Sequence, residues 1–244
     1  DYIWPAMQSL RNQVASFRYR SNGRFAAPMV IRVPVGGYIH GGLCHSQNIE
    51  AIFAHMPGFM IAHPSTAADA KGLLKTAIRL NDPVLFLEHK ALYRAASART
   101  GTPDASYLLP FGKARCVREG SSMTIVTYGM MVHKSVAAAR QLAKEGIEVE
   151  ILDLRTIVPL DMASVLQSVR KTHRVLVVHE DHEFMGFGAE IASQISDTAF
   201  EYLDAPVRRV AGAFSPIPFA DPLEQAVLPS EGGLTSAIRE LLAY

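Results

Sequence analysis

Apolar residues along the chain alternate between short continuous runs and runs with helical spacing. In the first half, the continuous runs predict buried strands at 29–34, 59–62 and 84–87. Between them, apolar positions recur every three or four residues, which predicts helices over 4–20, near 49–53 and over 66–80. Ser65 is the predicted N-cap of the last helix. This alternation is typical of a parallel sheet between helices.

The second half shows the same alternation after a segment of different composition. Residues 96–117 are rich in glycine, proline, serine and threonine without a sustained period, which predicts an interdomain linker. Beyond it the pattern predicts strands at 123–127, 149–152, 174–178 and 207–210. It also predicts helices over 132–145, 161–169 (capped by Asp161), 189–200 and 234–242. We therefore expect two α/β domains, over 1–95 and 118–244. The first is expected to be N-terminally incomplete, because the chain begins on a helix with no strand before it.

Charge, hydropathy and cysteine count indicate which classes of partner and which cellular compartment to expect. The 24 Lys and Arg residues against 23 Asp and Glu leave a net charge of +1 without long basic runs, so we expect no nucleic-acid partner. No apolar run approaches the roughly 18 residues that span a bilayer, so we expect no membrane partner either. The two cysteines, Cys44 and Cys116, are too few for a disulfide framework. This fits a reducing compartment, either the bacterial cytoplasm or the mitochondrial matrix.

The segment 36–47 carries the strongest candidate for chemistry. It places four glycines and two histidines in an otherwise apolar stretch that follows a predicted strand. Glycine lets the backbone adopt positive φ or approach a ligand closely, and His45 stands where a helix begins. In isolation, a histidine in this position is more often structural or solvated than catalytic. The role of His45 therefore depends on its context.

Two other polar features have plainer interpretations. The cluster 179–183, His-Glu-Asp-His-Glu, follows a predicted strand but lacks a zinc-ligand spacing, so we interpret it as a solvated polar loop. Gly186 and Gly188 miss the glycine spacing of a phosphate-binding turn, and they predict close packing of a helix instead.

The context of His45 resembles a known family. The segments that carry the resemblance are 35–58, 69–75, 82–84, 88–94, 153–161 and 186–191, and together they extend over essentially the entire chain. They closely resemble the beta subunit of thiamine-diphosphate-dependent 2-oxo acid dehydrogenases. The resemblance implies a transketolase-like pyrimidine-binding domain, with a parallel sheet between helices, followed by a transketolase C-terminal-like α/β domain. It also implies that the glutamate that activates the cofactor lies before Asp1.

The same resemblance assigns roles to two residues. Loss of CO2 from a 2-oxo acid requires an electron sink, which the thiazolium ring of thiamine diphosphate supplies. Tyr2 matches an aromatic position that lies against the aminopyrimidine ring. His45 matches the active-site histidine of the His-Ser-Gln motif, and it is expected to protonate the departing sulfur of a lipoyl group. The diphosphate and its Mg²⁺ are expected on a partner alpha subunit.

Some members of the family also hold a structural monovalent cation, K⁺, mainly through backbone carbonyls. The positions here that match this site are Ala27, Met29, Val30, Ala77, Leu80 and Asp82.

The resemblance further implies partners and a substrate class. We expect an assembly of two alpha and two beta subunits, a dihydrolipoyl acyltransferase core that contacts the C-terminal domain, and a lipoyl domain as acyl acceptor. The residues 92–96, Leu-Tyr-Arg-Ala-Ala, favour a branched-chain 2-oxo acid over pyruvate or acetoin. Two alternatives stay open: a transketolase-like or deoxyxylulose-phosphate-synthase-like transferase, and a docking fragment without activity.

Overall fold

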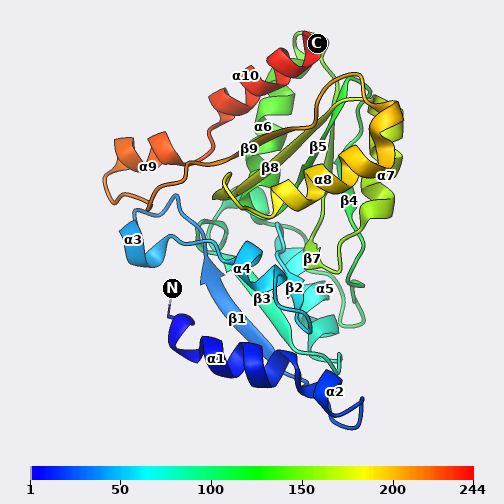
Figure 1. The fold of residues 1–244 in the computed structure, drawn as a ribbon. Helices are drawn as coiled ribbons and strands as arrows, with labels where there is room; N and C mark the ends of the chain where they lie inside the picture. Colours follow the sequence, from blue (N-terminus) through cyan, green and yellow to red (C-terminus); the bar gives the residue numbers. More distant parts are fainter. Residues whose placement is uncertain (1) are drawn as a thin grey trace.

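The computed structural model describes residues 2–244, which form two α/β units stacked end to end (Figure 1). The first unit contains a four-stranded sheet in the order β1-β3-β2-β7. Its strands are β1 (Val30–Val35), β2 (Met60–Ala62), β3 (Val84–His89) and β7 (Thr156–Val158). The first three are parallel, and β7 is antiparallel to β2. The predicted parallel sheet therefore comprises β1, β2 and β3, and β7 adds an unpredicted antiparallel strand at its edge.

The second unit contains a five-stranded sheet in the order β4-β6-β5-β8-β9. Its strands are β4 (Arg115–Arg118), β5 (Met123–Thr127), β6 (Val149–Asp153), β8 (Val175–His182) and β9 (Arg208–Gly212). Neighbours among the last four are parallel, whereas β4 is antiparallel to β6. Strand β4 occupies the end of the segment that was predicted as a linker.

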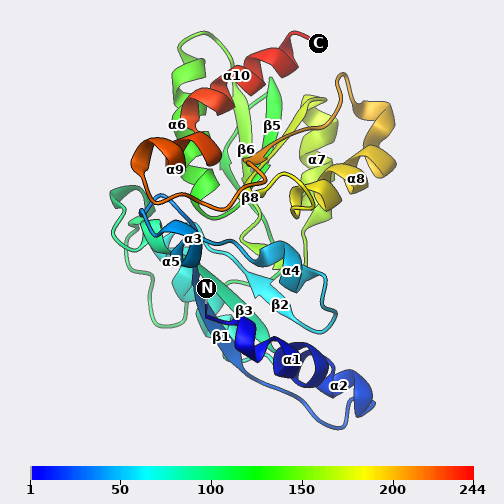
Figure 2. The same ribbon diagram turned by 60° about the vertical axis from the view of Figure 1, so that its left-hand side comes forward.

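Helices cover both faces of each sheet, as the apolar strands require. In the first unit these are α4 (Glu50–Ala54) and α5 (Ala67–Ala77), whereas α3 (Gly42–His45) lies outside the sheet (Figure 1). In the second unit they are α6 (Met130–Ala143), α7 (Met162–Thr172), α8 (Gly188–Ala199) and α10 (Glu231–Leu242), whereas α9 (Asp221–Val227) lies away from the sheet, beside α3 (Figure 1 and Figure 2). Figure 2 shows α6 and α10 on one side of the second sheet and α7 and α8 on the other.

Alternate residues of the central strands enter different cores. In β3, Val84 and Phe86 pack with α5, whereas Leu85 and Leu87 enter a core that continues into the second unit. In β8, Val175 and Val177 join that continuous core, whereas Leu176 and Val178 pack with α6 and α10. The two units therefore share one apolar core, and their relative position is fixed by packing.

The N-terminal segment differs from the single helix that was predicted over 4–20. A 3₁₀ turn at Trp4–Ala6 leads into α1 (Met7–Ser9), a π-helical stretch at Leu10–Ala15 and α2 (Phe17–Arg20). The wider π turn places residues five apart on one face, and Leu10 and Ala15 are both buried.

Helix α5 also begins differently from the prediction. Thr66, not Ser65, is its N-cap, because the Thr66 hydroxyl accepts the backbone N–H of Asp69 at 3.2 Å. The Ser65 hydroxyl instead donates to the buried carboxylate of Asp153 at 2.5 Å. The prediction that Asp161 caps α7 is confirmed, since its carboxylate accepts the N–H of Ser164.

A buried ion cluster joins α5 to the strands of the second half. The Asp69 carboxylate is almost fully buried and pairs with Arg115 and Arg155, each at 3.1 Å. Arg115 also contacts Asp153 at 3.3 Å. Because Arg115 belongs to β4 and Arg155 lies between β6 and β7, these ion pairs fix α5 of the first unit against segments from the second half of the chain.

Candidate active site

A closed loop over residues 36–48 carries the predicted histidine. The loop leaves β1, passes through α3 and is closed by a hydrogen bond from Gly36 N–H to the Gln47 carbonyl at 2.9 Å. Gly36 adopts φ +90°, and a Cβ at this position would lie 2.1 Å from His89 Nε2. Glycine is therefore required at residue 36 both by the backbone conformation and by the imidazole that packs against it.

The inner side of the loop rests on a buried carboxylate from the second unit. Glu180, near the end of β8, accepts the Gly37 N–H at 2.6 Å and the Asn48 amide at 3.1 Å. Its other oxygen lies 2.6 Å from Nε2 of His89, which is also buried. Burial by itself would raise the pKa of Glu180, but the charge of His89 and the donated hydrogen bonds hold it at about 2. Glu180 is thus an anion at neutral pH.

This arrangement corrects the interpretation of residues 179–183 as a solvated loop. His179, Glu180 and Asp181 are buried within β8. The interpretation failed because the buried strand continues into polar residues, whose partners come from distant parts of the chain. The prediction that the nearby glycines pack a helix is confirmed, because a Cβ on Gly188 would lie 2.4 Å from the His179 ring.

The outer side of the loop is held by the segment around α9. The Glu224 carboxylate, which is buried, accepts the backbone N–H groups of Ile39 at 3.3 Å and His40 at 3.2 Å. It also lies 3.1 Å from Nδ1 of His40. The Tyr38 hydroxyl donates to the carbonyl of Pro229 at 2.7 Å. These contacts fix both the backbone and the side chains of the loop.

Two groups of side chains bring potential metal ligands together among residues 2–244. In the first, His40, Asp221 and Glu224 converge, but Glu224 already accepts the loop hydrogen bonds. In the second, Cys116, Glu119 and Glu150 converge, and the Lys171 ammonium contacts both carboxylates. Since protein hydrogen bonds and a lysine satisfy these carboxylates, we assign a metal to neither group.

His45 ends α3 and lies beside the first residues of the chain. The Tyr2 hydroxyl is 3.4 Å from His45 Nε2, and the two ring centroids are 5.6 Å apart. The Lys90 ammonium donates to the His45 carbonyl, and the Trp4 indole donates to the Gln47 amide oxygen at 3.2 Å. Burial lowers the pKa of Lys90. The structure thus brings together the two residues that the resemblance proposed for the site.

Tyr2 and His45 line a cavity of about 570 Å³. Its other walls are mostly apolar and come from Ile3, Ile31, Arg32, Val33, Pro34 and Lys90. The Tyr2 side chain is 79% exposed, so an open aromatic face lies next to an imidazole. An open aromatic ring with apolar neighbours suits contact with a flat heterocycle, and these residues therefore fit the aminopyrimidine part of thiamine diphosphate.

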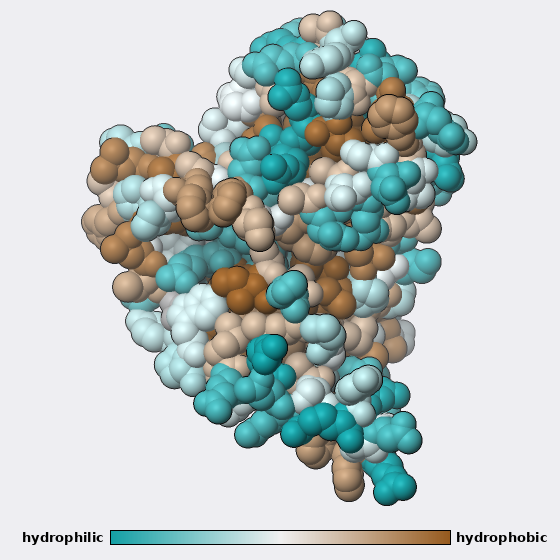
Figure 3. All heavy atoms as spheres, viewed as in Figure 1, coloured by the Kyte–Doolittle hydropathy of each residue, from teal (hydrophilic) through white to brown (hydrophobic). Residues whose placement is uncertain are grey.

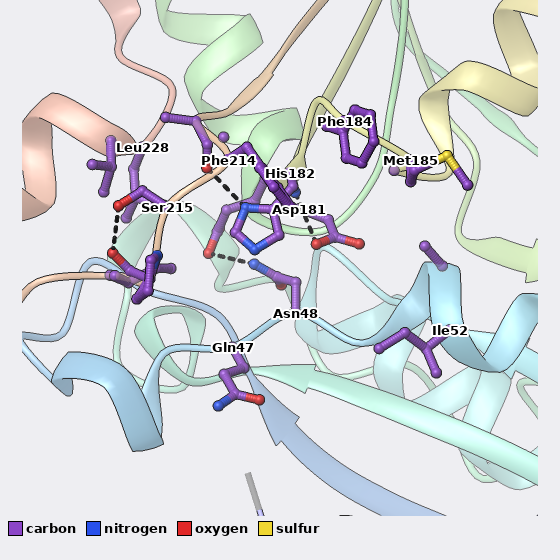
Figure 4. Close-up of a pocket in the computed structure, with 18 of the residues that line it drawn as sticks. Gln47, Asn48, Ile52, Asp181, His182, Phe184, Met185, Phe214, Ser215 and Leu228 are labelled. Carbon is purple, nitrogen blue, oxygen red and sulfur yellow. Dashed lines mark hydrogen bonds between the residues drawn. The ribbon is translucent and has the colours of Figure 1, made fainter.

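A second cavity of about 590 Å³ lies on the other side of the loop, between α4 and the end of β8. Figure 4 shows Asn48, Asp181 and His182 at its base and the apolar side chains of Phe184 and Phe214 at its rim. The space-filling view shows hydrophobic residues around α9 and in the band between the two units (Figure 3). The loop thus separates two cavities of different character.

The predicted cation positions lie at the start of β1 and around the turn that follows α5. The carbonyls of Ala27, Met29 and Ala77 each accept a backbone hydrogen bond. Asp82, the one carboxylate among the six predicted residues, receives Arg18 at 2.9 and 3.0 Å. A carbonyl oxygen has two lone pairs, so these oxygens keep one each. The cation site stays a prediction, and its carboxylate is already neutralised by Arg18.

Comparisons with known proteins identify the family of the chain. Residues 2–96 match the transketolase pyrimidine-binding domain family, and residues 112–234 match the transketolase C-terminal domain family. The chain is 44% identical to 2-oxoisovalerate dehydrogenase subunit beta of Bacillus subtilis, over all of this chain and 74% of that protein. It is 43% identical to pyruvate dehydrogenase E1 component subunit beta of the same organism, with the same coverage. The chain belongs to the family of beta subunits of thiamine-diphosphate-dependent 2-oxo acid dehydrogenases.

A solved structure shows the same fold as this beta subunit. It is a split-gene transketolase in an inactive beta4 tetramer, with a TM-score of 0.75 and 23% identity over 98% of this chain and 72% of that one. The resemblance and the two-domain transketolase-like fold drawn from the sequence are therefore confirmed.

Sequence reasoning missed the buried residues that hold the loop of this beta subunit. Glu180 and His89 are 91 residues apart in sequence, and no local pattern pairs them. One signal was available, because charged residues that directly continue an apolar strand must find partners if the strand stays buried.

Proposed function

We propose that this beta subunit acts in the oxidative decarboxylation of a 2-oxo acid and in transfer of the acyl group to a lipoyl domain. The observation that carries the proposal is the contact between Tyr2 and His45 at one cavity, since the two residues are 43 positions apart in sequence. Family membership supports the enzyme class. The identities of 43–44% to dehydrogenase subunits, against 23% to a transketolase, favour this reaction over a transferase.

Thiamine diphosphate, when bound, supplies the electron sink that makes loss of CO2 from a 2-oxo acid feasible. Tyr2 and its apolar neighbours would bind and orient the cofactor. Tyr2 presents its exposed ring to the cofactor, and Ile31 and Val33 form an apolar wall of the same cavity.

His45 is the proposed proton donor. Reduction of a lipoyl disulfide leaves a sulfur that needs a proton, and an imidazole can supply one near neutral pH. Lys90 holds the backbone of His45, and the Tyr2 hydroxyl lies beside Nε2. These contacts reduce the number of orientations open to the ring, which is what proton transfer at a defined atom requires.

The remaining features of the site are proposed to come from partners. An alpha subunit, in a complex of two alpha and two beta chains, would hold the diphosphate and Mg²⁺. The C-terminal domain would contact a dihydrolipoyl acyltransferase core, and the monovalent cation would be K⁺. The bacterial source of the similar proteins supports a cytoplasmic location. Among residues 2–244, no helix is long and apolar enough to cross a membrane.

A branched-chain 2-oxo acid is the proposed substrate. The support is the sequence at 92–96 and the slightly higher identity to 2-oxoisovalerate dehydrogenase. One methylene changes binding by only about 1–3 kcal/mol in an apolar pocket, so few substitutions separate this choice from pyruvate.

The substitution His45→Ala tests the proposed function in the assembled complex. Acylation of a free lipoyl domain, followed by mass spectrometry, should fall about 100-fold, because a general acid usually contributes 10²–10⁴-fold. Substrate oxidation with an artificial electron acceptor should fall less, since that route needs no lipoyl proton. His55→Ala removes an exposed histidine at the end of α4 and is the matched control. Lipoyl acylation within threefold of the wild type in His45→Ala would show that the assignment is wrong.

A further inference from the structure

Glu180 receives hydrogen bonds from both ends of the loop that carries His45. Gly37, at the loop's start, donates its backbone N–H, and Asn48, at its end, donates its side-chain amide. Both donors reach the same oxygen, Oε1, and the second oxygen pairs with His89 at the end of β3. One carboxylate from the second unit therefore joins three segments of the first.

The middle of the loop has little apolar burial to fix its position. Leu43 is 61% exposed, and Cys44 and His45 are exposed as well. Helix α3 has four residues, too few to be stable without tertiary contacts. The position of His45 therefore depends on polar contacts: those at the loop's ends, those of Ile39 and His40 with Glu224, and the Lys90 contact to its backbone.

Glu180 is suited to this task because it is rigid. Its side chain is 6% exposed, it lies within a central strand of the second sheet, and three donors satisfy it. A buried, fully satisfied carboxylate has one low-energy position. Lys90, in contrast, reaches the loop through a long flexible side chain.

We propose that Glu180 is a positioning residue: by anchoring Gly37 and Asn48 it holds the 36–48 loop, and with it His45, in the geometry used for acyl transfer to the lipoyl group. Only the effect of anchoring on acyl transfer rests on the proposed function of His45. The anchoring of the loop is a separate claim and has a separate readout.

Two substitutions of Glu180 separate anchoring from charge. Glu180→Gln keeps an oxygen that can accept the Gly37 and Asn48 hydrogen bonds, and its amide can donate to a His89 tautomer that accepts at Nε2. Glu180→Ala removes every acceptor and leaves the buried Gly37 N–H without a partner. The loop should therefore stay ordered in the first variant and become mobile in the second.

Hydrogen exchange in the full-length protein, followed by mass spectrometry, measures the anchoring. In Glu180→Ala, the peptide over 36–48 should exchange about tenfold faster than in the wild type, the change expected for loss of a buried hydrogen bond. Glu180→Gln should stay within about threefold of the wild type. Glu150→Ala is the matched control, because Glu150 is also a buried, hydrogen-bonded strand carboxylate of the second sheet, but it contacts Ser168 and Lys171. It should not accelerate the 36–48 peptide selectively.

Acyl transfer tests the consequence of anchoring. In the assembled complex, Glu180→Ala should lower kcat for lipoyl acylation by about 10- to 100-fold, whereas Glu180→Gln should retain most of it. If Glu180→Ala does not fold, Asn48→Ala removes one of the donors and should give a smaller change in both measurements. Equal exchange at 36–48 in Glu180→Ala and Glu150→Ala, or equal loss of acylation in the two Glu180 variants, would overturn the proposal. If His45→Ala leaves acylation intact while Glu180→Ala still frees the loop, the assigned role of His45 fails and the anchoring stands.

Discussion

Glu50 should make the stability of this protein fall as the pH rises through the neutral range. The residue begins α4 and is fully buried, and its carboxyl group accepts the Tyr128 hydroxyl at 3.0 Å. Burial, together with the nearby Asp181, raises its pKa from 4.5 to about 8. Between these two values the folded protein holds a proton that the unfolded chain has released. Stability is therefore greatest at the acidic side of this window and is lost as the pH approaches 8.

The size of the effect follows from the pKa values. Each pH unit within the window costs about 1.4 kcal/mol, so the range from pH 6.5 to 8 should cost about 2 kcal/mol. Asp153 and Glu180, with pKa values of about 6 and about 2, complete most of their change below this range. Burial lowers the pKa of His63 from 6.5 to about 3 and that of His179 from 6.5 to about 4, so the unfolded chain binds more protons at these residues and they oppose the Glu50 slope, but only up to about pH 7.5. The fall in stability above pH 6.5 therefore belongs mainly to Glu50.

The substitution Glu50→Gln should remove most of this slope, because it mimics the protonated carboxyl group. Urea unfolding at pH 6.5, 7.25 and 8 gives the free energy of unfolding for each variant. The control Glu145→Gln changes an exposed carboxylate that pairs with Arg239, and it should keep the wild-type slope. If Glu50→Gln loses as much stability over this range as the wild type, burial of Glu50 does not control the pH dependence.

Two further substitutions test the contacts between the units. Asp69→Ala leaves its two half-buried arginine partners without their shared carboxylate, although Arg115 keeps Asp153, so the free energy of unfolding in urea should fall by about 1–3 kcal/mol, and a loss below about 0.5 kcal/mol would contradict a structural role for this cluster. Gly36→Ala places a Cβ against the His89 ring at positive φ and should lower the melting temperature through a loss of about 1–3 kcal/mol. Gly101→Ala adds a Cβ in open space, so it should change stability by less than about 0.5 kcal/mol, and an equal effect of the two glycine substitutions would refute the steric explanation.

Hydrophobic patterning predicted the strands that lie inside the sheets because burial on both faces leaves a continuous apolar run. Strands β4 and β7 were not predicted, since each has at most four residues and lies at a sheet edge. Such strands form through pairing with distant partners, and their own sequence carries little signal. The break in the N-terminal helix was missed for a similar reason, because a π turn keeps the apolar spacing close to that of an α-helix.

The candidate site was predictable where a residue belongs to a recognisable motif. Tyr2 and His45 were found through the resemblance, and the structure places them in contact. Glu180 was not predicted, because its function depends on partners 143 and 132 positions away. Local sequence can show that a charge must be buried, but it does not show which backbone or side chain will satisfy it.

Because of strand β7, the boundary between the two folded units does not coincide with one position in the sequence. Residues 156–158 come from the second half of the sequence, yet they complete the edge of the first sheet beside β2. The pyrimidine-binding unit is therefore not encoded by one continuous segment. A chimaera that exchanged residues 2–96 between two relatives would pair a foreign β2 with the host's β7, so the compatible unit of exchange must include 156–158 as well.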